Sequence, residues 1–179
     1  MSVIETFLPT AARKTAEWLQ QMRDRHSATA RPLNAEELTA LGAHFDATLL
    51  DSVRVKTVTE IEKPPFYDGL RSQLAFVGVR VAFDFAAVRG ITFDNCILVR
   101  ESPLSVALLF HELVHVEQYR QLGIPRFAAA YVRGLAENRF EYEENPIEKI
   151  AVSLKERFNQ GDHFSAGDEI KAWLATREY

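Results

Sequence analysis

Apolar residues recur at helical spacing in the first part of the chain. They predict an amphipathic helix over residues 10–26, with a face formed by Ala12, Ala16, Leu19 and Met22. A second helix is predicted from Asn34 to about Leu50, because Asn34 followed by Glu37 is the pattern of a capping box. The first part of the chain is therefore expected to be helical.

The apolar pattern changes after Ser52, where β-branched residues nearly alternate with polar ones and predict a strand, at Val53, Val55 and Val58. Two short apolar segments, Ile91–Phe93 and Cys96–Val99, flank Asp94-Asn95 and predict a tight hairpin. The apolar segment Leu74–Phe85 is ambiguous, and we favour a strand for part of it.

Helical patterns fill the remainder of the chain, over residues 102–122, 125–140, 146–158 and from about Ser165. Ser102 and Pro103 are expected to start the first of these helices as N-cap and first helical residue, and Gly123 with Pro125 should end it after Leu122. Strands followed by helices indicate an α+β fold rather than an alternating one.

Length and composition predict one ordinary domain. The 179 residues most economically form a single unit, with a helical N-terminal segment at 1–50 whose apolar faces close over the main core at 51–179. The apolar fraction of 47% and the charged fraction of 26% are typical of soluble globular proteins. A net charge of −4 and a pI near 5.8 argue against a nucleic-acid partner.

The sequence favours a cytoplasmic location. Cys96 is the single cysteine, so no intramolecular disulfide can form, and a reducing compartment is the simpler expectation. Met1–Pro9 lacks the basic start and apolar core of a secretory signal. The longest apolar run, Leu104–Phe110, is too short to cross a bilayer, so no membrane partner is expected. Nothing in the sequence indicates an oligomeric state.

The segment His-Glu-Leu-Val-His at 111–115 carries the most informative chemistry. His111 and His115 lie four residues apart and project from the same side of a helix, so both imidazoles can bind one ion. Burying two histidines in an apolar helix is costly unless they are paired or bound to metal. Zinc accepts imidazole nitrogens at about 2.0–2.1 Å and leaves a position open for water. We expect one Zn²⁺ per chain, with Glu112 as the general base that takes a proton from the activated water.

A catalytic zinc site needs a third protein ligand. We favour Glu148, which lies in the first turn of a predicted helix that starts at Pro146, with the small residue Ala151 on the same face. The alternative is that Glu148 forms a capping box with Asn145 and bonds to the backbone instead. The other candidate ligands are Cys96, Glu137, Glu141, Glu143, Glu144 and His163.

Two segments of the chain, His-Glu-Leu-Val-His-Val-Glu-Gln at 111–118 and Asn-Pro-Ile-Glu-Lys-Ile-Ala at 145–151, resemble the minimal gluzincin-type domains of bacteria, zinc metallopeptidases mostly of unknown function. The resemblance implies a zincin-like fold and a peptide or protein substrate. It also implies His111, His115 and Glu148 as zinc ligands and Glu112 as general base.

The resemblance further implies that the strand before the metal helix, at 96–100, is a sheet edge along which an extended substrate pairs. One departure from the larger gluzincins concerns the group that stabilises the oxyanion. The chain has no motif-anchored tyrosine or histidine for this role, and Tyr142 and Tyr119 are the candidates.

Three alternative functions stay open on the sequence. A deformylase-like amidohydrolase would use Cys96 with the two histidines as zinc ligands, although a lone cysteine in a strand is usually a small buried apolar residue. A non-catalytic binding domain would hold zinc as a structural cross-link through four protein ligands, with no position open for water. A metal-dependent nuclease is disfavoured by the acidic pI.

Overall fold

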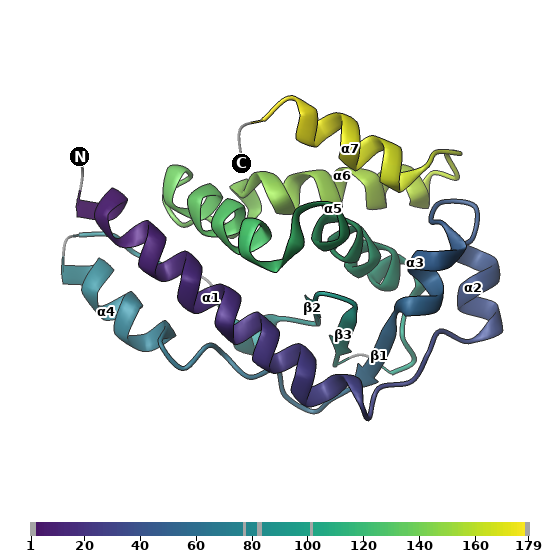
Figure 1. Cartoon of the computed structure of the whole chain (residues 1–179), viewed down its shortest axis with the longest axis horizontal. Coiled ribbons are helices and arrows are strands. Elements are labelled where there is room, and N and C mark those ends of the chain that lie inside the picture. Colours follow the sequence, from purple (N-terminus) through teal and green to yellow (C-terminus); the bar gives the residue numbers. More distant parts are fainter. Residues whose placement is uncertain (1–2, 77, 82–83, 101, 178–179) are drawn as a thin grey trace.

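A computed structural model describes residues 3–76, 78–81, 84–100 and 102–177, and within them the chain has the α+β architecture expected from the sequence (Figure 1). Its helices and small sheet follow in the order α1 (Val3–Ser27), α2 (Ala35–Leu41), α3 (Ala47–Ser52), β1 (Arg54–Thr57), α4 (Tyr67–Phe76), η1 (Phe85–Ala87), β2 (Gly90–Phe93), β3 (Cys96–Val99), α5 (Val106–Glu137), η2 (Tyr142–Glu144), α6 (Pro146–Asn159) and α7 (Ala166–Ala175). The elements η1 and η2 are single turns of 3₁₀-helix.

The sheet is mixed, with strand order β1-β3-β2. The hairpin of β2 and β3 around Asp94-Asn95 is confirmed, and β1 pairs parallel to β3 with Val55 opposite Ile97. The expectation that residues 96–100 form a sheet edge is wrong, because β1 occupies the far side of β3 and makes it the central strand. All four β3 residues are buried, as an uninterrupted apolar strand requires. The edge strand beside α5 is β2.

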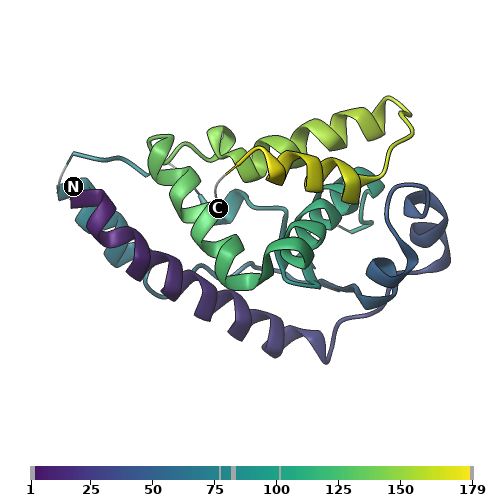
Figure 2. The same ribbon diagram turned by 45° about the horizontal axis from the view of Figure 1, so that its top comes forward.

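Helix α1 begins earlier than predicted, at Val3, and runs along the sheet and α5. In both views its first half lies beside α4 (Figures 1 and 2). Its apolar face is buried against β2, β3 and the second half of α5 through Trp18, Leu19 and Met22. Helix α1 therefore covers the sheet and part of α5.

The single helix predicted from Asn34 to Leu50 is instead two short helices. The capping box of Asn34 and Glu37 forms as predicted and starts α2. The helix ends at Leu41, and α3 starts only after Asp46, whose carboxylate accepts the backbone N–H of Leu49 at 2.8 Å. Asp46 thus acts as a second N-cap inside the predicted helix, which its sequence position did not reveal.

The preference for a strand within Leu74–Phe85 is wrong for the residues that the structure describes; Val77, Ala82 and Phe83 lie outside them. Residues 74–76 end helix α4. Gly78, at φ +80°, donates its N–H to Ala75, and the N–H of Val79 bonds to Leu74, which is the hydrogen-bond pattern of a Schellman helix end. The left-handed glycine thus ends a helix here, where the apolar pattern had suggested a strand.

Helix α5 carries the histidine motif through the middle of the molecule. It starts after Ser105, whose hydroxyl accepts the N–H of Leu108, so the predicted start at Ser102-Pro103 is wrong by one turn. The predicted break is confirmed, since Gly123 has the non-helical values φ 72° and ψ 158° and divides α5 into two helical halves (Figure 2). Among the described residues, no helix combines the length and apolar character needed to cross a membrane.

Gly134, in the second half of α5, permits the close approach of α6. A Cβ atom at Gly134 would lie 2.5 Å from Oδ1 of Asn145 and 3.0 Å from Cδ of Pro146. Because distances this short force a shift, a side chain at this position would push away the residues that start α6. Glycine here fixes where the first turn of α6, and with it Glu148, lies relative to α5.

We expect Gly134→Ala to lower the free energy of unfolding by about 1–2 kcal/mol, because steric overpacking exceeds the gain in helix propensity of about 1 kcal/mol. The matched control is Gly69→Ala in α4, where a Cβ meets nothing within 4 Å. That variant should be stabilised by about 0.5–1 kcal/mol. Urea denaturation followed by circular dichroism measures both, and an equal gain for both variants would contradict the close approach.

Candidate metal centre

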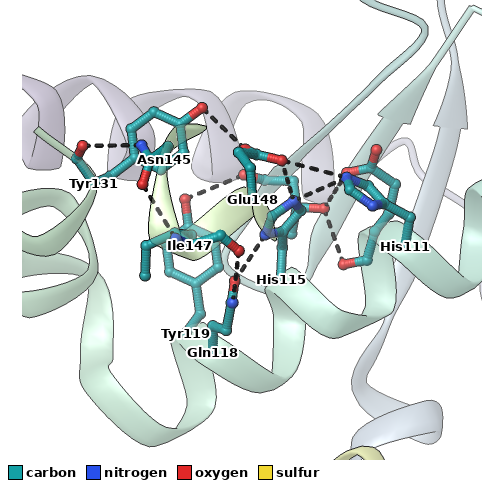
Figure 3. Close-up of polar contacts among 10 residues, drawn as sticks. His111, His115, Gln118, Tyr119, Tyr131, Asn145, Ile147 and Glu148 are labelled. Carbon is teal, nitrogen blue, oxygen red and sulfur yellow. Dashed lines mark hydrogen bonds and ion pairs between the residues drawn. The ribbon is translucent and has the colours of Figure 1, made fainter. Parts of the chain in front are cut away.

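Three side chains from two helices, His115 and Glu148 buried and His111 partly buried, place their donor atoms around one point (Figure 3). His111 and His115 come from the first half of α5, and Glu148 comes from the first turn of α6. The two Nε2 atoms are 3.2 Å apart, and Oε2 of Glu148 lies 3.5 Å from Nε2 of His111 and 3.3 Å from Nε2 of His115. The three atoms form a nearly equilateral triangle.

The size of this triangle matches a tetrahedral zinc site. Ligand atoms placed 2.0–2.1 Å from a tetrahedral zinc ion lie about 3.3–3.4 Å from one another. Oε2 of Glu148 is buried and has no hydrogen-bond partner, and its contacts are the two ion pairs with the imidazoles. A buried acceptor in this state costs about 1–3 kcal/mol unless something else satisfies it. The residues present therefore fit a zinc ion held by His111, His115 and Glu148, with a fourth position left open.

Glu148 does not form the capping box that was its alternative role. Asn145 caps α6 alone, since its Oδ1 accepts the N–H of Ile147 at 3.1 Å while its own N–H donates to Tyr142. The Glu148 carboxylate turns the other way, and its Oε1 accepts the hydroxyl of Tyr131 at 3.0 Å. This leaves Oε2 directed at the imidazoles. Ala151, the small residue expected to allow close packing of α6, is fully buried in the core.

The other candidate ligands lie outside this group of three. Cys96 is buried among apolar residues of α1 and the sheet, and burial raises the pKa of its thiol. This arrangement does not provide the Cys/His/His site of the deformylase-like alternative. The remaining candidates are exposed side chains, at Glu137, Glu141, Glu143, Glu144 and His163.

Gln118 orients His115 and was assigned no role from the sequence. Its Oε1 accepts a hydrogen bond from Nδ1 of His115 at 2.8 Å, and its Nε2 donates to the carbonyl of Ile147 at 3.0 Å. Because Nδ1 carries the proton in this bond, Nε2 presents its lone pair when His115 is neutral. The same side chain ties α5 to α6 beside Glu148. Its position one turn after His115 was the signal available in the sequence.

Glu112 faces β2 instead of joining the triangle. Its Oε2 accepts the hydroxyl of Thr92 at 2.7 Å, and the side chain is only 3% exposed. A Cβ on Gly90 would lie 2.5 Å from Oε1 of Glu112, so the strand can approach the carboxylate only with glycine there. Glu112 nevertheless lines the same cavity as His111 and His115. This is the placement that a base adjacent to the metal, but not bound to it, requires.

Three tyrosines surround the centre. Tyr131 donates to Glu148, and Tyr142 also interacts with the Glu148 carboxylate. Burial raises the pKa of both phenols, and the nearby negative charge raises it further, so both stay protonated hydrogen-bond donors. Tyr119 donates to the backbone carbonyl of Thr92 at 3.2 Å. Of the two oxyanion candidates, Tyr142 is therefore beside the donor triangle and Tyr119 is engaged by β2.

The charges of His115 and Glu148 depend on each other. Burial alone would lower the pKa of His115, but the Glu148 carboxylate raises it to about 9. Burial alone would raise the pKa of Glu148, but the positive charge of His115 and contacts with both imidazoles hold it well below its usual range. Without metal, the pair is consequently ionised at neutral pH.

A largely apolar cavity of about 190 Å³ adjoins the triangle. Its wall comes from α1, α4, β2, both halves of α5, and α6, and it includes the three donor residues together with Glu112. The fourth position of the candidate site thus borders space that a substrate could enter rather than packed protein.

No family model, curated protein or solved structure matches this chain. The resemblance to gluzincin-type domains consequently stays a prediction from the sequence motifs at 111–118 and 145–151. The assignment of the candidate centre rests on its geometry.

Zinc affinity should depend steeply on pH, because a pKa near 9 means that the metal must displace a proton from His115 at neutral pH. We expect the apparent affinity of the metal-free protein to rise about tenfold per pH unit up to about pH 9 and then to level off. Competition with a chromogenic chelator measures this. His163→Ala, which removes an exposed histidine, should leave the profile unchanged, and a flat profile in the parent protein would count against a proton held by His115.

Proposed function

We propose that the protein is a zinc-dependent metallopeptidase with one zinc ion per chain, held by His111, His115 and Glu148. The observation that carries the proposal is the triangle of buried donor atoms, with sides of 3.2, 3.3 and 3.5 Å, whose open side faces a cavity. Three protein ligands with one open position are typical of catalytic zinc, whereas structural zinc sites are closed by four ligands. Among the described residues only these three His, Cys, Asp or Glu side chains converge, which favours catalysis over a structural cross-link.

Glu112 is the general base in this proposal. A zinc ion at the triangle would supply an acidified water and polarise the substrate carbonyl. Glu112 takes the proton of that water and passes it to the leaving amine, while Thr92 fixes the orientation of its carboxylate. Gln118 holds the His115 imidazole in the tautomer that ligation needs. Tyr142, beside Glu148, is the favoured donor to the oxyanion.

A peptide substrate is supported by the position of β2. This strand is an edge of the sheet and contributes Gly90, Ile91 and Thr92 to the cavity wall. Arg100 donates its N–H to the carbonyl of Arg89 at 2.8 Å, so these two residues form a hydrogen-bonded pair of the antiparallel ladder. By the alternation of such pairs, the N–H and C=O of Gly90 point to the outer edge. An extended peptide can add there as a further strand. Pairing with an extended substrate, which was expected for residues 96–100, is thus proposed for β2.

The first test combines metal analysis with a single amide substitution. Protein purified without chelators should contain about one zinc per chain, and Glu112→Gln should keep the metal while hydrolysis falls by roughly 10²- to 10⁴-fold, because the amide cannot accept a proton. Cleavage is measured by incubating the protein with an unfolded protein substrate and identifying the peptide products by mass spectrometry. The control is Glu143→Gln, at an exposed position, which should keep both properties. Zinc loss in Glu112→Gln comparable to that in His111→Ala would refute the role of base.

The second test removes the charge of the third ligand. Glu148→Gln retains an oxygen that can accept the Tyr131 hydroxyl, so the fold should persist. Zinc affinity should fall by more than the roughly 10- to 100-fold typical of losing a group that only orients a ligand. Isothermal titration measures the change, and Cys96→Ser is the comparison that should keep full affinity. Unchanged affinity in Glu148→Gln would exclude it as a ligand, and metal loss in Cys96→Ser would restore the deformylase-like alternative.

A further inference from the structure

The cavity next to the donor triangle is lined mostly by apolar and aromatic side chains. Among the described residues that line it, the one charged side chain besides the three donor residues and Glu112 is Arg71 of α4. Its aromatic lining includes Trp18 of α1 and Phe127 of α5, and Phe127 stacks on Tyr119 with ring centroids 3.8 Å apart. A charged group inside this space would lose its hydration and gain few partners. The lining therefore selects an apolar occupant.

The volume of the cavity limits the size of that occupant. A cavity of roughly 150 Å³ with apolar walls holds one benzene molecule, whereas pockets for drug-sized ligands enclose about 300–1,000 Å³. At about 190 Å³, this cavity has room for one aromatic ring and little more. Rings prefer edge-to-face or offset contacts with other rings, which walls of this composition provide.

We propose that this cavity is a specificity pocket that takes one aromatic side chain of a peptide substrate, at a residue flanking the bond that is cleaved. This rests on the proposed peptidase function and adds its substrate class. Continuity with the site supports it, because His111, Glu112, His115 and Glu148 belong to the same wall as the aromatic residues. Gly90, on the outer edge of β2, lies in that wall as well, so a peptide paired with β2 has the pocket within reach of its side chains.

Two helices away from the donor triangle, α1 and α4, also contribute to the choice of substrate. Trp18 and Leu19 belong to α1, and Leu70 and Leu74 belong to α4, yet all four line the pocket. In the described part of the chain, none of these four side chains forms a hydrogen bond or an ion pair with a residue of the donor triangle. Substitutions in these helices should therefore alter which side chain is accepted without removing the metal ligands or the base.

The test starts from a peptide that the zinc-loaded protein cleaves, resynthesised with Ala, Leu, Phe or Lys at each position flanking the cleaved bond. At one of these positions Phe should exceed Ala in kcat/KM by about 10- to 100-fold, from the burial of one large apolar side chain. Lys should be the poorest. Equal rates for Phe and Ala at every flanking position would overturn the proposal.

Cavity variants connect the preference to this pocket. Val132→Phe fills the cavity from α5, so the Phe-to-Ala ratio should fall towards one while the Ala peptide is still cleaved. Its control is Val152→Phe, the same change at an exposed position on α6, which should keep the ratio of the parent protein. Leu70→Ala enlarges the pocket and should raise cleavage of a Trp peptide relative to the Phe peptide. A ratio that Val132→Phe leaves unchanged would place the preference elsewhere and overturn the assignment.

A binding measurement separates the pocket from the chemistry. The chain has two tryptophans, so Trp173→Phe leaves Trp18 in the pocket wall as the single reporter. Toluene should shift the Trp18 emission of the metal-free protein saturably, and Val132→Phe should weaken this binding at least about tenfold. Absence of saturable binding would refute the pocket. Toluene binding without zinc-dependent cleavage of any peptide would instead refute the proposed function, and with it the assignment of a substrate side chain.

Discussion

The contact between α5 and the first turn of α6 determines everything proposed for this protein. The two histidines need only one helix, but the third donor atom comes from a different helix and must arrive within a few tenths of an ångström of its place. Gln118 ties α5 to the carbonyl of Ile147, Asn145 bonds to both helices, and Gly134 supplies the space for their approach. These contacts use backbone groups, so the position of Glu148 is set by the main chain of α6 rather than by a flexible surface side chain.

The same contact controls the electrostatics. The buried Glu148 beside the buried His115 is stable in the metal-free protein because the imidazole can carry the compensating charge. Tyr131 satisfies the outer oxygen of the carboxylate and leaves the inner one to the imidazoles. The Glu112 carboxylate accepts a hydrogen bond from Thr92 of β2 and does not join Glu148 and the imidazoles. A second carboxylate thus lies nearby without adding its negative charge to that of Glu148. The proposed ligand Glu148 and the proposed base Glu112 therefore differ in the element that each carboxylate contacts: Tyr131 of α5 for Glu148 and Thr92 of β2 for Glu112.

Local signals in the sequence predicted the elements, and contacts between distant segments decided the rest. The hairpin at Asp94-Asn95, the cap at Asn34 and the break at Gly123 depend on a few neighbouring residues and were found. The central position of β3 depends on pairing with β1, which lies some forty residues earlier in the chain, and no local pattern reveals it. In the site, the spacing of the histidines pointed to one face of a helix. Thr92, Gly90 and Tyr131 gave no signal, because their partners lie on other elements.

The break at Gly123 has a consequence for the order of folding. Because the chain turns at this residue, α5 supplies the histidines from its first half. From its second half, Tyr131 and Gly134 contact the first turn of α6. All three donor atoms thus belong to one continuous stretch that ends at Glu148, and closing it requires only a short loop. The pocket is different, because Trp18 must return from the far N-terminal helix to complete its wall. Contacts of low sequence separation form fastest, so the centre should assemble before α1 docks and gives the cavity its shape.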